Sequence, residues 1–173
     1  KTLIRVDIDA AQLARTPQSG LSIFSSAKTA AAGMLGFLEG HKAISEGASR
    51  AEAARKAAWK ELTPKMQTEI GVIDAIWRTL PKAIIVGDST QAVYAGNYYC
   101  DAPRARSWFN AATGYGALGY APPAAVGAAL AEPDAPIICL VGDGGLQFSL
   151  SEIGSAADAG ARVIFLVWNN DGY

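Results

Sequence analysis

Three short apolar runs constrain the fold of this chain more than any other feature. Residues 83–86, 137–141 and 163–168 are apolar throughout, and patterns typical of helices lie between them. Strands without polar positions are typical of parallel sheets that helices cover on both faces, because neither face of such a sheet meets water. We therefore expect an α/β fold with a parallel sheet and helices on both of its faces.

Strands and helices alternate along most of the chain. The patterns predict strands at 3–8, 83–86, 107–110, 137–141 and 163–168, and helices at 25–38, 49–62, 64–80, 122–131 and 149–160. Polar residues typical of helix starts support three of these helices: Thr63 before Pro64, and the capping boxes formed by Ser49 with Glu52 and by Ser149 with Glu152.

Composition excludes several classes of function. The formal net charge of -1 gives no electrostatic reason to expect a nucleic acid or an anionic membrane as partner. No apolar run approaches the roughly 20 residues that cross a bilayer. Cys100 and Cys139 are too few for a disulfide framework, which favours a reducing cytoplasm. His41 is the single histidine, so we expect neither a zinc site nor a Ser-His triad.

Polar residues follow the last two apolar runs. Gly142-Asp143-Gly144 comes after the run 137–141, and Asn169-Asn170 comes after the run 163–168. A strand-helix-strand unit forms a right-handed crossover with parallel strands, so Asp143 and Asn170 should meet at the edge where open α/β sheets bind ligands. Their oxygen atoms suit Mg²⁺, and the backbone carbonyl of Gly172 is a candidate third ligand. The glycines beside Asp143 let backbone N–H groups approach an anion.

This spacing resembles the thiamin diphosphate-dependent enzymes, whose signature is Gly-Asp-Gly, a spacer of this length and then Asn-Asn. The resemblance implies the thiamin diphosphate-binding fold, with Asp143, Asn170 and the Gly172 carbonyl as Mg²⁺ ligands and Gly142, Gly144 and Gly145 beside the cofactor. It also implies three parts: the end of a central α/β domain (1–42), a linker and helix (43–63), and a cofactor domain truncated at its C-terminus (64–173). We interpret the chain as a fragment.

Two upstream stretches extend the resemblance. Residues 114–127 look like the family segment that holds the aminopyrimidine ring. By that match, the Gly116 carbonyl would accept a hydrogen bond from the 4′-amino group, and Leu118 would hold the two rings in a bent conformation. Plain core packing is the alternative for Leu118. Gly87, Ser89 and Thr90 follow a strand where the family contacts the terminal phosphate, although an ordinary polar turn would look similar.

The family implies an enzyme in which the cofactor does the organic chemistry. No catalytic residue is expected in this chain, because the family's activating glutamate lies on an N-terminal domain of a partner subunit. A homodimer or homotetramer with the cofactor site between subunits follows, and this chain alone should be inactive. Glu152 is better explained as a helix cap than as that glutamate.

The reaction implied is non-oxidative decarboxylation of a 2-oxo acid. Residues 86–94 lack the Gln-His-Gln-Met-Trp run usual in acetolactate synthases and look closer to related decarboxylases. Among these, the decarboxylases that act on 5-guanidino-2-oxopentanoate are the nearest candidates. Carboligation of the acetolactate synthase type is the alternative.

Two readings of another class remain. Gly114-x-Gly116-x-x-Gly119 matches the dinucleotide fingerprint of NAD-binding oxidoreductases, but Pro122-Pro123 falls where the fingerprint helix should already run, and Glu132 lies outside the expected context for a ribose contact. The other reading is a non-catalytic subunit that serves only in assembly.

Overall fold

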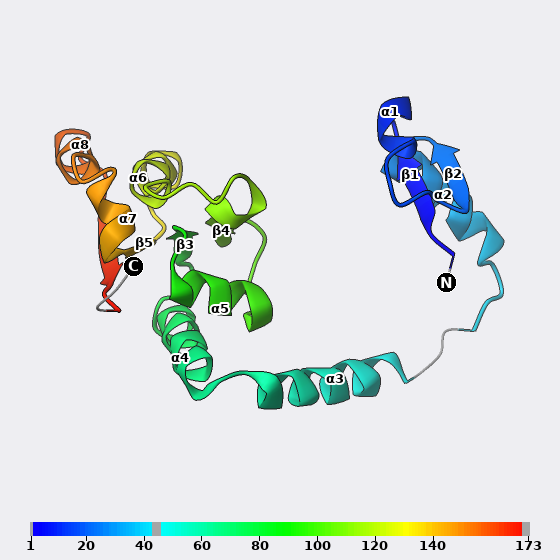
Figure 1. Ribbon diagram of the computed structural model, residues 1–173, viewed down its shortest axis with the longest axis horizontal. Helices are drawn as coiled ribbons and strands as arrows, with labels where there is room; N and C mark the ends of the chain where they lie inside the picture. The colour runs from blue at the N-terminus through cyan, green and yellow to red at the C-terminus, as the bar shows by residue number, and fades with distance from the viewer. Residues whose placement is uncertain (1, 43–45, 171–173) are drawn as a thin grey trace. The chain divides into compact units, whose positions relative to one another are not determined.

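The computed structural model describes residues 2–42 and 46–170, and the chain divides into two compact units, Lys1–Arg50 and Ala51–Tyr173 (Figure 1). In the first unit two strands pair in parallel, and none of the described residues is fully buried. Its elements are β1 (Ile4–Asp7), α1 (Ala10–Leu13), β2 (Leu21–Phe24) and α2 (Ala27–Phe37). β1 and α2 confirm the predicted strand and helix, whereas α1 and β2 were not predicted.

The second unit is built on a four-stranded parallel sheet in the order β4-β3-β5-β6. The two central strands, β3 and β5, are buried at every position. The predicted parallel α/β fold is therefore confirmed, and each predicted strand of this unit is found within one residue of its expected ends. The strands are β3 (Ile84–Gly87), β4 (Trp108–Asn110), β5 (Ile137–Gly142) and β6 (Val163–Trp168).

The side chains of β3 and β5 alternate between two apolar clusters, one on each face of the sheet. Helices cover both of these faces. α6 (Ala121–Ala131) packs on one face, and α4 (Pro64–Thr79) and α5 (Gln91–Tyr99) pack on the other, as Figure 1 shows. The α6 face contains Ile84, Val86, Ile137, Cys139, Val141, Ala121, Ala125 and Ala129. The opposite face contains Ile85, Ile138, Leu140, Ile73, Trp77, Ala92 and Val93. Among the described residues, no helix is both long and apolar enough to cross a membrane.

One of the three predicted helix caps is confirmed. The Thr63 hydroxyl accepts a hydrogen bond from the Met66 N–H (3.2 Å) at the start of α4. The capping box at Ser49 is wrong, because α3 (Gly47–Glu61) begins before that residue and the Ser49 hydroxyl donates to the Glu46 carbonyl.

The capping box at Ser149 is also wrong. An unpredicted short helix, α7 (Asp143–Gln147), is followed by turns that lead directly into α8 (Glu152–Asp158), so the chain is not extended where an N-cap needs it to be. Ser149 instead uses its backbone carbonyl, which accepts from the Glu152 N–H at 3.0 Å. Glu152 is the first residue of α8 but takes no part in a capping box.

Close packing of α5 against β4 and α4 depends on Gly96. A Cβ at this position would lie 2.7 Å from the Trp108 ring and 2.9 Å from Ile73. A glycine at this contact therefore lets α5 pack closely on the sheet.

Gly96→Ala is expected to lower the free energy of unfolding by about 1–3 kcal/mol, because the added methyl group overfills the contact with the Trp108 ring. Gly71→Ala in α4 is the matched control, since a Cβ there meets nothing within 4 Å, and its higher helix propensity should raise stability by up to about 1 kcal/mol. Urea unfolding of the complete protein measures both. Equal effects of the two substitutions would contradict the packing argument.

Candidate functional site

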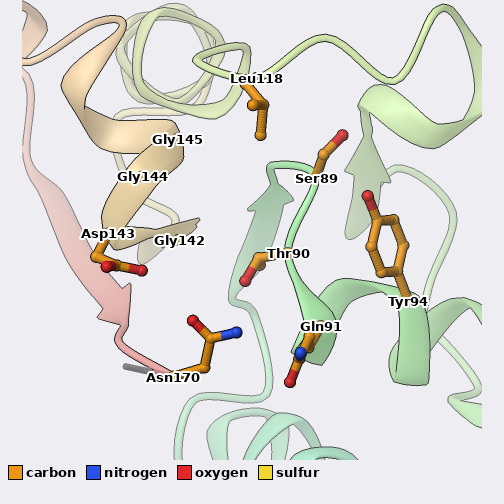
Figure 2. Close-up of a pocket in the computed structure, with 10 residues that line it drawn as sticks. All are labelled: Ser89, Thr90, Gln91, Tyr94, Leu118, Gly142, Asp143, Gly144, Gly145 and Asn170. Carbon is orange, nitrogen blue, oxygen red and sulfur yellow. The ribbon is translucent and has the colours of Figure 1, made fainter. Parts of the chain in front are cut away.

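A pocket of about 240 Å³ lies where β3, β5 and β6 end (Figure 2). The three strands are neighbours and run parallel, so their carboxyl ends open at the same edge of the sheet. This is the edge at which the sequence predicted a ligand site. The lining residues are Ser89, Thr90, Gln91, Tyr94, Leu118, Gly142, Asp143, Gly144, Gly145 and Asn170.

Asp143 and Asn170 come together as the spacing predicted. In the register of β5 with β6, Gly142 lies opposite Trp168, so Asp143 follows directly after one paired strand end and Asn170 lies two residues after the other. The Asp143 carboxylate and the Asn170 side-chain oxygen face each other in Figure 2. The predicted Gly-Asp-Gly turn is wrong in one respect, because Asp143 is the first residue of α7 and the strand enters the helix without a loop. Gly172 lies outside the described residues.

The start of α5 forms a second wall of the pocket. Its N-cap, Thr90, is extended and makes no side-chain capping bond, so this side chain leaves the first N–H groups of the helix uncapped. Gly142 lets the end of β5 approach closely, since a Cβ there would lie 3.3 Å from the Thr90 hydroxyl oxygen. A helix start beside a glycine-rich strand end is a favourable site for an anion.

The charge of the pocket limits what can bind there. Its described lining contains the carboxylate of Asp143 and neither lysine nor arginine. No group of three His, Cys, Asp or Glu residues suited to a metal occurs among the described residues. A divalent cation would therefore need oxygen atoms from the Asn170 amide and from a bound molecule such as a phosphate, as well as from Asp143. Mg²⁺ is commonly bound in this way, by one or two carboxylates together with phosphate oxygens and water.

Leu118 lies in the wall opposite the start of α5. Its side chain is 41% exposed and extends into the pocket, so the alternative of plain core packing is wrong. The backbone of Gly116 nearby has φ +66°, which favours glycine. Its carbonyl accepts a hydrogen bond of 2.7 Å from the Ser89 hydroxyl, although Gly116 itself does not line the pocket. Of the two lone pairs of that carbonyl, one remains for a ligand.

The loop around Gly116 does not have the form of a dinucleotide fingerprint. After β4 the chain makes a short 3-10 turn at Ala111–Thr113, and α6 begins only at Ala121, after the last glycine of the run. The fingerprint needs the helix to start within its glycines, so that the helix end approaches the pyrophosphate. This geometry removes the support for the oxidoreductase reading.

Three residues of the site region escaped the sequence analysis. Gln91 and Tyr94 line the pocket from the first turn of α5, a helix that the sequence did not predict. Asp88 is only 1% exposed and accepts hydrogen bonds from three backbone N–H groups. Gly87, which was predicted to contact the cofactor, is not among the lining residues. It packs tightly, because a Cβ there would lie 2.7 Å from Val93.

Neither cysteine is a candidate nucleophile. Burial, with a smaller effect of the Asp88 charge, raises the pKa of the Cys139 thiol to about 12. Burial, with a smaller effect of Asp74, also raises the pKa of Cys100 to about 12. Both thiols are therefore protonated near neutral pH, and Cys139 packs in the core as the sequence predicted.

The family of the chain follows from comparison with known proteins. Residues 88–173 match the family model described as "Thiamine pyrophosphate enzyme, C-terminal TPP binding domain". The chain belongs to the thiamin diphosphate-dependent enzymes. The matched stretch starts at Asp88 and includes every residue that lines the pocket.

Relatives and a solved structure agree with this family. "Probable 2-ketoarginine decarboxylase AruI" of Pseudomonas aeruginosa is 34% identical over 98% of this chain and 31% of its own length. The acetolactate synthase large subunit of Haemophilus influenzae is 29% identical over 97% of this chain and 30% of its own length. A structure from Mycobacterium smegmatis, named among thiamin diphosphate-dependent enzymes, is 30% identical with a TM-score of 0.50, covering 57% of this chain and 20% of that one. The chain thus spans under a third of these proteins.

A buried carboxyl group lies beside the pocket, on α4. Glu69 is 2% exposed, and its Oε1 has no hydrogen-bond partner among the described residues. It lines a small groove that shares Gln91 and Tyr94 with the main pocket. Burial raises the pKa of Glu69 above its usual 4.5, and the charge of Lys65 opposes this shift. Folding therefore shifts the equilibrium of Glu69 toward its protonated form.

Glu69→Gln should become more favourable to stability, relative to the native protein, as the pH rises from 4 to 7. A carboxyl group with a raised folded-state pKa contributes stability that is full below its unfolded pKa and is lost as the pH rises through its folded pKa. Glutamine stays neutral, so the variant loses no stability from this position over the same pH range. Urea unfolding at several pH values measures the difference, with Glu61→Gln at the exposed end of α3 as the control. A difference that does not change with pH would contradict the argument.

Proposed function

We propose that the complete protein binds thiamin diphosphate with Mg²⁺ at this pocket and decarboxylates a 2-oxo acid without oxidation. One observation carries the proposal. In a chain of this family, the side-chain oxygens of Asp143 and Asn170 face each other at the ends of adjacent parallel strands. A carboxylate and an amide oxygen in this position suit one Mg²⁺ ion.

The residues present fit the cofactor. Asp143 and Asn170 would hold Mg²⁺, and the start of α5 with the glycines 142, 144 and 145 would receive the diphosphate. The predicted third ligand, the Gly172 carbonyl, remains an expectation. Leu118 offers an apolar surface to the rings, and the Gly116 carbonyl keeps a lone pair for an amino group. When bound, thiamin diphosphate supplies the nucleophilic carbon and the electron sink that decarboxylation of a 2-oxo acid needs.

The substrate that we propose is 5-guanidino-2-oxopentanoate. Support comes from the relative named as a 2-ketoarginine decarboxylase, which aligns over 98% of this chain. The departure of residues 86–94 from the Gln-His-Gln-Met-Trp run of acetolactate synthases points the same way. Carboligation of the acetolactate synthase type is the second candidate, because relatives with that name are 28–29% identical over nearly all of this chain.

The rest of the active site would come from a second subunit. The pocket, at about 240 Å³, is smaller than the roughly 300–1,000 Å³ typical of ligand sites, which supports a further wall from elsewhere. We propose that a partner subunit supplies this wall together with the activating glutamate, in a homodimer or homotetramer. The described residues alone would then hold and orient the cofactor without catalysing the reaction. We also place the protein in the cytoplasm.

Asp143→Ala in the complete protein should weaken Mg²⁺-dependent binding of thiamin diphosphate by at least about 10–100-fold, because it removes the one charged side chain of the described pocket lining. Calorimetric titration with the cofactor, in the presence and absence of Mg²⁺, measures this. Asp134→Ala, in the exposed loop before β5, is the matched control and should bind as the native protein does. Native affinity in the Asp143 variant would remove this residue from the metal site.

A panel of 2-oxo acids should show the highest kcat/KM for 5-guanidino-2-oxopentanoate, with carbon dioxide and the corresponding aldehyde as products. The assay uses the complete protein with thiamin diphosphate and Mg²⁺, and pyruvate serves as the reference substrate. Faster turnover of pyruvate with acetolactate as product would establish the second candidate instead. Failure to turn over any member of the panel would contradict decarboxylation.

A further inference from the structure

We infer that Asp88 is a positioning residue, which holds the loop of residues 114–120 in place for the cofactor rings without touching the cofactor. This inference rests on the proposed function, because it assigns a role within the same site. Asp88 follows β3 directly and begins the turn into α5. Its side chain is buried, and Asp88 is not among the residues that line the pocket.

The carboxylate of Asp88 joins two walls of the pocket through hydrogen bonds. Its Oδ1 accepts from the N–H groups of Ser89 (2.8 Å) and Gly119 (3.2 Å), and its Oδ2 accepts from the N–H of Ala121 (2.9 Å). Ser89 belongs to the turn beside the start of α5, whereas Gly119 and Ala121 flank the end of the loop that carries Leu118. One side chain therefore spans both segments.

A second contact fixes the other end of this loop. The hydroxyl of Ser89 donates to the Gly116 carbonyl at 2.7 Å. Adjacent residues of one turn thus hold the loop on both sides of Leu118. The third wall also lies close, since a Cβ at Gly145 would come within 3.1 Å of Asp88 Oδ1. The three segments that form the pocket meet at this carboxylate.

The hydrogen bonds of Asp88 explain why an acid occupies a buried position. A buried carboxylate is unfavourable unless hydrogen bonds offset the loss of water, and bonds from N–H groups to a charged acceptor are about twice as strong as neutral ones. Residues 114–120 contain no strand or α-helix, so they depend on such bonds for a defined conformation. A loop fixed before the ligand arrives loses less entropy on binding.

The Asp88→Asn substitution is expected to affect the part of the site that holds the rings and the part that holds the phosphates differently. The asparagine carbonyl can keep the two bonds of Oδ1, but its NH2 group then meets the Ala121 N–H, and two donors cannot bond. In the complete protein we expect roughly tenfold weaker binding of thiamin diphosphate, since one bond to a charged group is lost. Binding of inorganic pyrophosphate with Mg²⁺ should change less than about twofold, because the Ser89 side of the turn is retained.

Calorimetric titration of each ligand with Mg²⁺ measures this split, and Asp134→Asn in the exposed loop before β5 is the matched control. Unchanged affinity for thiamin diphosphate, or equal weakening of both ligands, would overturn the positioning role. If the native protein itself binds no thiamin diphosphate, the proposed function is wrong. The positioning role of Asp88 is then wrong as well, and this outcome is distinct from the other two.

Ser89→Ala tests the inference even where the Asp88 variant does not fold, because it leaves the buried carboxylate intact. Loss of the hydroxyl should speed backbone hydrogen exchange in residues 114–121 of the complete protein, measured by mass spectrometry, and leave β5 protected. Native exchange rates in residues 114–121 would show that the turn does not hold the loop.

Discussion

The pairing of β5 with β6 is the interaction on which the candidate site depends. A slip of one residue in this register would move Asn170 by about 3.3 Å relative to Asp143 and would turn every side chain of β6 to the opposite face of the sheet. Bonds to a metal tolerate only about 0.2 Å. Apolar clusters on both faces of β5 oppose such a slip, so core packing and the geometry of the site are set together.

The two halves of the pocket differ in how they are held. Asp143 leaves a buried strand and enters a helix at once, and Thr90 begins a helix that packs on the sheet. Regular elements of this kind fix side chains more closely than loops do. Leu118 lies instead on a loop, whose conformation depends on hydrogen bonds to the turn at Asp88 and Ser89. Variation in this loop would therefore change the proposed contacts to the cofactor rings and leave the proposed Mg²⁺ and phosphate half unchanged.

Local patterns explain which features the sequence could predict. Continuous apolar runs identify β3 and β5, which are buried at every position, and also β6, which is partly exposed at the end of the described sheet. The crossover rule then brings Asp143 and Asn170 to one edge. The start of α4 was predictable because the Thr63 hydroxyl accepts a hydrogen bond from the first turn and Pro64 has the φ of a first helical residue. Each of these signals is read within one element, or across one strand-helix-strand unit.

Other features depend on contacts that no local pattern shows. α7 begins Asp-Gly-Gly, which has low helix propensity, and its backbone conformation follows from burial of Leu146 against the sheet. α5 contains Gly96 at a contact with Trp108, where the sequence alone suggests a helix breaker. Asp88 is adjacent to a predicted phosphate contact, yet its side chain turns inward, because its partners come from residues about 30 positions along the chain.

Charge balance determines how the proposed ligands would bind. Thiamin diphosphate carries a negative diphosphate, and the described lining offers a carboxylate and no cationic side chain. The diphosphate alone would be repelled by Asp143. Mg²⁺ alone would find one carboxylate and one amide oxygen among the described lining residues, which is few for an ion that prefers six oxygen ligands. Each ligand removes the obstacle to binding of the other. Mg²⁺ offsets the repulsion between the diphosphate and Asp143, and the phosphate oxygens complete the coordination of Mg²⁺. Linkage makes this reciprocal, so the factor by which Mg²⁺ strengthens cofactor binding must equal the factor by which the cofactor strengthens Mg²⁺ binding.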